Sequence, residues 1–169
     1  MSQSGDAAGP VLCVADTNIL IDLDNGGILG HLLSLPYRFI IPDAVLAELE
    51  RPSPAWVQSL GFEIGVLEGS AILEIHALLP AHPGLSVADL FALFLARDRQ
   101  AMLLTGDSRL RTLAESRGLA VHGALWVLDE LVRMEVLGPL QACQAMETML
   151  ARGARLPAAE CQKRRGQWR

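Results

Sequence analysis

Four acidic side chains, spread along the chain, follow predicted strands or lie in the helices after them. They are Asp16, Glu48, Asp89 and Asp107. If the fold brings these positions to one edge of a sheet, the carboxylates repel one another unless a cation lies between them. Mg²⁺ and Mn²⁺ are hard ions that prefer such oxygen ligands. The four acids therefore predict a site for a divalent cation.

Asp16 and Asp107 form the strongest pair, because each comes at the end of a short apolar run. Residues 11–15 lead into Asp16, and residues 101–104 lead into Thr105, Gly106 and Asp107. Parallel strands end at the same edge of a sheet, so the two acids are expected on one side of it. Either acid alone could instead cap the helix that follows it.

Three polar neighbours are candidates to support these acids: Asn18, Thr105 and Ser108. The amide of Asn18 could orient Asp16 or a water molecule. The hydroxyls of Thr105 and Ser108 could donate hydrogen bonds to a carboxylate or to a phosphate oxygen. We expect all three to stand behind the metal ligands rather than among them.

Glu48 and Asp89 each leave an alternative open. Glu50 lies two residues after Glu48 and so on a different face of the same predicted helix, and spacing alone does not choose between them. Asp89 lies three residues after Ser86, which is where the acid of a capping box would be. A structural role for Asp89 is therefore an alternative to a chemical one.

Short apolar runs alternate with helical patterns along the chain. Strands are predicted at 11–15, 38–41, 62–67, 101–104 and 119–121. Helices are predicted at 18–23, 28–35, 43–50, 71–79, 108–117, 124–137 and 139–152, with a further one capped by Ser86. This alternation predicts a three-layer α/β/α domain with a central, mainly parallel sheet of four or five strands.

Composition limits the class of protein. The 169 residues suit one domain that buries roughly 70% of its unfolded surface, and 51% hydrophobic against 20% charged residues excludes general disorder. The first ten residues lack the features of a signal peptide, and the apolar stretches are too short to cross a bilayer. We expect a cytoplasmic protein that does not enter a membrane. Three distant cysteines, Cys13, Cys143 and Cys161, argue against a disulfide framework and a zinc site.

The net charge of −5 argues against a protein that coats nucleic acid, but the charge is unevenly distributed. Residues 155–169 carry five basic side chains and one acid, for a net charge of +4, so the remainder carries about −9. We therefore divide the chain into a domain over 1–154 and a basic C-terminal tail over 155–169. The tail could approach RNA phosphates, or it could be a solvated, frayed end.

Four short motifs occur in a fixed order along the chain. They are Ala-Asp-Thr-Asn at 15–18, Val-Leu-Ala-Glu-Leu at 45–49, Ser-Val-Ala-Asp at 86–89 and Leu-Leu-Thr-Gly-Asp at 103–107. Together they resemble the PIN-domain family, the metal-dependent ribonuclease fold known from the toxins of VapBC toxin-antitoxin pairs. The resemblance extends from about Val11 to Val121. The resemblance rests on the order and spacing of the four motifs together.

The resemblance implies an acidic cluster of Asp16, Glu48, Asp89 and Asp107 that binds Mg²⁺ or Mn²⁺, with Asn18 and Thr105 in support. It selects Glu48 over Glu50, since the family's glutamate precedes a leucine. The implied reaction is hydrolysis of an RNA phosphodiester by water, without a protein nucleophile, which leaves a 5′-phosphate and a 3′-hydroxyl. The implied partners are a small antitoxin and a second copy of the chain. Glu50-Arg51-Pro52, and Ser-Arg-Leu-Arg after Asp107, depart from the commonest toxin pattern, so substrate and partner stay open.

Other residues have plainer interpretations. Asp22 and Asp24 have the spacing of a phosphotransferase pair but follow helical sequence, so we interpret them as a solvated helix end. His31, His76, His82 and His122 show no ligand spacing and are interpreted as structural. Arg109 and Arg111 could contact RNA beside Asp107 or simply face solvent. The apolar faces of residues 124–152 favour core over a dimer surface or an antitoxin groove.

The sequence thus favours a Mg²⁺- or Mn²⁺-dependent ribonuclease of the VapC type. Two other classes remain open. One is a PIN-fold binding or regulatory module whose acids hold no metal. The other is a phosphatase-like or receiver-like protein that uses Asp16 as a nucleophile or phosphate acceptor.

Overall fold

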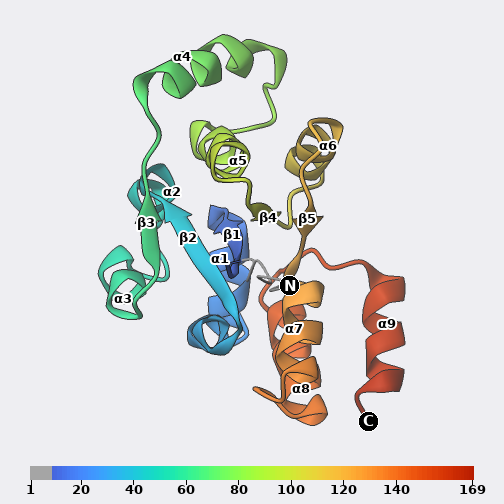
Figure 1. Ribbon diagram of the computed structural model, residues 1–169. Helices are drawn as coiled ribbons and strands as arrows, with labels where there is room; N and C mark the ends of the chain where they lie inside the picture. Colours follow the sequence, from blue (N-terminus) through green and yellow to red (C-terminus); the bar gives the residue numbers. More distant parts are fainter. Residues whose placement is uncertain (1–8) are drawn as a thin grey trace, which may run out of the picture.

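The computed structural model describes residues 9–169, and its central feature is a sheet of five parallel strands. The strands are β1 (Val11–Ala15), β2 (Tyr37–Pro42), β3 (Glu63–Gly65), β4 (Met102–Leu104) and β5 (Val121–His122). Their order across the sheet is β3-β2-β1-β4-β5. Helices cover both faces (Figure 1). The predicted three-layer α/β/α fold with a mainly parallel sheet is confirmed.

The strand order places the predicted acids at one position in the sheet. β1 pairs with β2 on one side and with β4 on the other, so the direction of winding reverses between β1 and β4. In open parallel sheets, the crevice beyond the carboxyl ends of the strands at such a reversal is the usual ligand site. Asp16 directly follows β1, and Asp107 comes three residues after the end of β4.

Both faces of the sheet are buried, which explains why its strands are continuous apolar runs rather than alternating ones. Along β1, Cys13 and Ala15 belong to one core, whereas Val14 belongs to the other. Burial raises the pKa of the Cys13 thiol to about 12. Cys13 is thus a core residue.

The helices fall into two layers. They are α1 (Thr17–Asn25), α2 (Asp43–Glu48), α3 (Pro54–Ser59), α4 (Gly69–Leu78), α5 (Val87–Arg99), α6 (Ser108–Ser116), α7 (Ala124–Arg133), α8 (Pro139–Ala151) and α9 (Ala158–Gln167), with 3₁₀ turns η1 (Leu29–Ser34) and η2 (Leu79–Ala81). α5 and α6 cover one face, with α4 packed outside α5, and α1, α7 and α8 cover the other (Figure 1).

Two departures from the predicted helices have clear local causes. The helix predicted to end at residue 137 ends at Arg133, because Glu135 adopts a left-handed φ of 57° that a helix cannot include. No helix is predicted between residues 50 and 71, yet Pro54–Ser59 forms α3. The Ser53 side chain accepts a hydrogen bond from Trp56 N at 3.2 Å, and Pro54 occupies the first helical position.

The basic C-terminal segment contains a helix that packs on the rest of the chain. In α9, Arg164 forms two hydrogen bonds to the carboxylate of Asp129 on α7, and Arg165 pairs with Glu147 on α8. Trp168 is only 6% exposed. Two of the segment's basic side chains therefore neutralise acids of the domain.

Helix α7 directs its apolar residues into the core. Val127, Leu128 and Leu131 are fully buried there, so this face does not form an exposed groove.

All three cysteines are free thiols. Within residues 9–169, no helix combines the length and the apolar character needed to span a bilayer.

Candidate active site

Asp16 is a buried carboxylate at the junction of β1 and α1. Its backbone N–H donates to Leu104 O of β4 at 3.1 Å, which continues the pairing of the two strands. Its side chain caps α1, since Oδ1 accepts from Ile19 N at 2.8 Å, and Oδ2 accepts from the hydroxyl of Thr105. The residue is 0% exposed. Burial raises its pKa to about 7, although the bonds from Thr105 and Ile19 favour the ionised form.

Thr105 connects Asp16 to Asp107. The Thr105 hydroxyl donates to Asp16 and accepts from Asp107 N at 3.0 Å, and Thr105 itself is fully buried. Asp107 then caps α6, because its Oδ1 accepts from Leu110 N at 2.8 Å. Each acid uses one carboxylate oxygen for its cap. The capping role and a place in the acidic cluster are therefore compatible.

Asp89 has the structural role that the sequence offered, and it also interacts with other acids. The capping box is present: Ser86 N donates to Asp89 Oδ2 at 2.8 Å, and Asp89 N donates to the Ser86 hydroxyl at 3.0 Å. Burial raises the pKa of Asp89, and the charges of Asp107 and Glu48 raise it further. Asp89 is thus close enough to both acids to interact with them electrostatically.

Glu48 is the last residue of α2 and is exposed. Its Oε2 accepts a hydrogen bond of 2.9 Å from the hydroxyl of Thr17, the first residue of α1. This bond holds Glu48 toward the helix that Asp16 caps. Glu50 lies beyond the end of α2, after the buried Leu49.

Electrostatic interactions connect the predicted acids in pairs. Asp89 and Asp107 both raise the pKa of Asp16, and Asp107 and Glu48 both raise that of Asp89. Across residues 9–169, the ion pairs include none of these four side chains. The site therefore collects negative charge without a protein cation to neutralise it.

The other predicted site residues have different surroundings. Asn18 and Ser108 are exposed, and neither side chain forms a hydrogen bond with any part of residues 9–169. Arg111 donates to Val121 O at 3.3 Å and lies 3.5 Å from the Glu115 carboxylate, whereas Arg109 is exposed. Thr105 is the one of the three proposed supporting residues that bonds an acid directly in the described structure.

Sequence reasoning missed two residues at this edge. Thr17, which holds Glu48, was not singled out, although a hydroxyl residue directly after Asp16 was a usable signal. Asp22 was interpreted as part of a solvated helix end, but it is half-buried, and burial raises its pKa. Its Oδ2 lies 3.7 Å from the point that a Cβ at Gly106 would occupy. It is therefore a fifth carboxylate beside the loop that carries Asp107.

A comparison with protein families decides the classification. The sequence model of the family described as DUF3368: PIN domain matches residues 12–169. The chain belongs to this PIN-domain family. The resemblance found in the four sequence motifs is thus confirmed, and the family match also includes α7, α8 and α9. PIN domains are generally nucleases, and they generally use divalent metal ions.

Two further comparisons complete the description. No curated protein matches this PIN domain. A solved structure that it resembles is a PilT N-terminus domain protein from the hyperthermophilic archaeon Sulfolobus solfataricus P2. The two are 14% identical with a TM-score of 0.45, and the match covers 67% of this chain and 87% of the other.

The acids of this PIN domain fit a divalent ion by chemistry and charge. All four supply carboxylate oxygens, the donors that Mg²⁺ and Mn²⁺ prefer, and Asp16 is buried without a cationic partner. The four carboxylates lie farther apart than the ligands of a formed metal site. Within residues 9–169, no three His, Cys, Asp or Glu side chains are placed so that they could hold one ion.

Proposed function

We propose that this PIN domain is a Mg²⁺- or Mn²⁺-dependent endoribonuclease. The observation that carries the proposal is the pair formed by Asp16 and Asp107, which follow the two strands at the reversal of winding and are joined through Thr105. Family membership supports nuclease chemistry in general. The acidic edge supports metal dependence, because its charge lacks a protein counter-ion.

In this proposal, Asp16, Glu48, Asp89 and Asp107 are the carboxylates that would move together from their wider spacing to bind the ion. Thr105 and Thr17 position Asp16 and Glu48. When bound, a divalent ion supplies Lewis-acid activation of water and offsets charge on the leaving oxygen. The chain's own contribution is to orient Asp16, Asp89 and Asp107 through the caps of α1, α5 and α6. Water attacks phosphorus and the bond to the 3′ oxygen breaks, which leaves a 5′-phosphate and a 3′-hydroxyl.

The first test is cleavage of a mixed cellular RNA pool by purified protein with Mg²⁺, Mn²⁺ or EDTA. The wild type should cleave only with metal, whereas Asp16→Ala and Asp107→Ala should lose cleavage. Glu48→Gln and Glu50→Gln form a matched pair, since both remove one exposed charge from the same segment. We expect only Glu48→Gln to lower the rate. Metal-independent cleavage, or equal effects in the matched pair, would contradict this assignment.

A second candidate is a binding or regulatory module that retains the PIN fold. The wide spacing of the acids favours it. Folded, inhibitor-free protein that binds RNA but does not cleave it with either metal would support this module over the nuclease. A phosphate-accepting role for Asp16 is disfavoured by the family match, because PIN domains are generally nucleases.

The toxin role is a finer proposal that rests on the resemblance to VapC proteins. In it, the chain forms a homodimer and is inhibited by a small antitoxin. An adjacent gene for a small DNA-binding protein, and inhibition of RNA cleavage by its product, would support the role. The mass of the purified protein in solution tests the homodimer separately. Cleavage chemistry does not depend on either result.

A further inference from the structure

A surface hollow of about 460 Å³ lies between α6 and the segment that enters α5. Its lining residues are His82, Ser108, Arg109, Thr112, Leu113 and Ser116. We call this hollow the α6 groove. Ser108 directly follows Asp107, so the groove begins beside the acidic edge. Figure 1 shows the segment between α4 and α5 passing close to α6.

Arg109 is the cation of the α6 groove, and its neighbour Gly84 leaves room for it. A Cβ at Gly84 would overlap the Arg109 guanidinium, so the backbone of this loop lies directly against the arginine side chain. Arg109 is nonetheless exposed. Over residues 9–169, it forms neither an ion pair nor a side-chain hydrogen bond.

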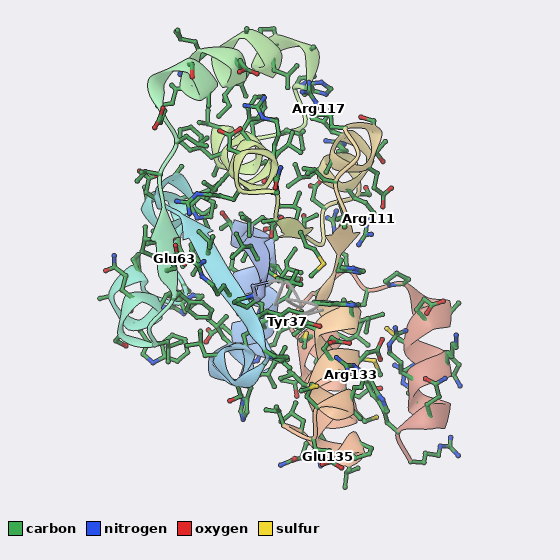
Figure 2. The ribbon with its side chains drawn as sticks, in the orientation of Figure 1. Tyr37, Glu63, Arg111, Arg117, Arg133 and Glu135 are labelled. Atoms are coloured by element: carbon green, nitrogen blue, oxygen red, sulfur yellow. The ribbon has the colours of Figure 1, made fainter. Side chains whose placement is uncertain are left out.

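The two other arginines of this region already have partners within the protein. Arg111 bonds Val121 O and lies near Glu115, and Arg117 lies over the Phe94 ring at 5.7 Å. Figure 2 shows these two side chains at different levels of α6. Arg109 is therefore the arginine of α6 whose charge remains available for an external anion.

The position of Arg109 gives the helix no stabilisation. It is the second residue of α6, where a positive charge opposes the helix dipole. The hydroxyls of Thr112 and Ser116 already donate to carbonyls of their own helix, at 2.9 and 2.6 Å. Donors for an anion in the groove thus come from Arg109, the exposed Ser108 hydroxyl and the first amides of α6.

We propose that the α6 groove holds the backbone of single-stranded RNA beside the cleaved bond, with Arg109 in contact with one phosphate. This proposal rests on the proposed ribonuclease function and names the side of the acidic edge along which the substrate lies. RNA fits because a polyanion that approaches an acidic edge needs a cation next to that edge, and Arg109 is two residues from Asp107. A positively charged groove that follows the backbone is the usual means of binding single strands.

The test measures binding of a short labelled single-stranded RNA by fluorescence anisotropy in excess EDTA, so that cleavage is absent. Arg109→Gln should weaken binding on the order of tenfold at low salt. It should also reduce the slope of log affinity against log salt by about 0.7, as expected for one lost phosphate contact. Arg117→Gln is the matched control, because it removes the same charge from the other end of the helix, and its effect should stay below about twofold.

A cleavage assay with metal separates this inference from the proposed function. Arg109→Gln should raise KM and leave kcat unchanged, because a contact with a phosphate next to the scissile one binds substrate and transition state equally. Thermal unfolding should show Arg109→Gln to be at least as stable as wild type. If the wild type neither binds nor cleaves RNA, the function and the inference both fail.

Two outcomes overturn the inference alone. If the wild type cleaves RNA and Arg109→Gln matches Arg117→Gln in binding, the groove does not hold RNA, which is the result expected if it takes an acidic protein segment instead. If Arg111→Gln weakens binding and Arg109→Gln does not, the RNA lies on the β5 side of Asp107.

Discussion

The Thr105 hydroxyl donates a hydrogen bond to the carboxylate of Asp16, and both residues are fully buried. The same hydroxyl accepts from Asp107 N, so one side chain links the ends of β1 and β4. The two strands are paired neighbours, which fixes the distance that this link must cover. Asp16 and Asp107 are thus held relative to each other by the protein itself, before any ligand arrives.

The Thr105→Val variant tests the contribution of the hydroxyl apart from that of the side-chain shape. The valine is nearly isosteric, but it leaves Asp16 Oδ2 and Asp107 N without their partner. Because both groups are buried or half-buried, we expect a loss of about 1–3 kcal/mol in the free energy of unfolding. RNA cleavage should fall about 10- to 100-fold, as for other residues that orient metal ligands. Urea unfolding and cleavage rates measure the two effects.

The control for this change is Thr105→Ser, which keeps the hydroxyl and loses one methyl group. Its cleavage rate should stay near that of the wild type, although its stability falls slightly. Equal loss of activity in the serine and valine variants would show that the methyl packing, rather than the hydrogen bond, matters.

Asp16 should make the metal-free protein less stable as pH rises. Burial raises its pKa from 3.8 to about 7, so the folded protein retains this proton after the unfolded chain has released it. Below about pH 4 both states are protonated and the penalty is absent. Between about pH 4 and 7 the free energy of unfolding should fall, by about 4 kcal/mol in total, and then level off.

Asp16→Asn isolates this contribution, because it keeps an oxygen acceptor for Ile19 N and removes the titration. In urea unfolding with EDTA buffers, the free energy of unfolding of the variant should rise steadily relative to that of the wild type from about pH 4 to 7. The variant should nevertheless be inactive. A difference between the two proteins that does not change with pH would contradict a buried, titrating Asp16.

A divalent ion should relieve the same charge and stabilise the fold. At a Mn²⁺ concentration about 100 times its Kd, binding adds about 2.7 kcal/mol, or roughly 5–10 °C in Tm for a chain of this size. Asp107→Asn should abolish the shift while retaining the cap of α6, since asparagine is also a good N-cap. Glu50→Gln should keep the full shift. An equal shift in all three proteins would indicate unspecific binding.

The sequence was informative where chemistry and local structure coincide. Asp16 and Asp107 each follow an apolar run, and in a parallel sheet those positions share an edge, so the strand pattern alone predicted that both lie there. It could not give the bond from Thr17 to Glu48, because that contact joins residues 31 positions apart on two helices. Spacing could not decide between the two roles of Asp89, since the residue both belongs to the capping box of α5 and interacts electrostatically with other acids.

The C-terminal segment shows why composition misleads about packing. Its basic residues suggested either RNA contact or a frayed end, because the acids that pair with them lie far away in the sequence. Arg164 meets Asp129 across 35 positions, and Arg165 meets Glu147 across 18. The one sequence feature of this segment that indicates a packed helix is Trp168, an aromatic residue in a polar stretch.

Trp168→Ala should therefore destabilise the protein even though it is the penultimate residue. The side chain is 6% exposed, and its removal should cost about 3 kcal/mol in the free energy of unfolding. Trp56→Ala is the matched control, since that indole is 43% exposed and should cost much less. Urea unfolding of both variants measures the difference. Equal costs would show that α9 contributes little to the fold, and cleavage by folded Trp168→Ala should remain normal.

Thr17→Val should damage activity with little effect on stability. The hydrogen bond from Thr17 to Glu48 Oε2 is exposed, so water can replace it and the free energy of unfolding should change by about 0.5 kcal/mol or less. Glu48 would then lose the contact that directs it toward Asp16, and kcat should fall about tenfold. Thr148→Val is the control, because its exposed hydroxyl bonds only Gln144 O within α8. If both variants cleave RNA at the wild-type rate, Glu48 is positioned without Thr17, and the exposed rim of the acidic edge is less ordered by protein contacts than the buried pair formed by Asp16 and Thr105.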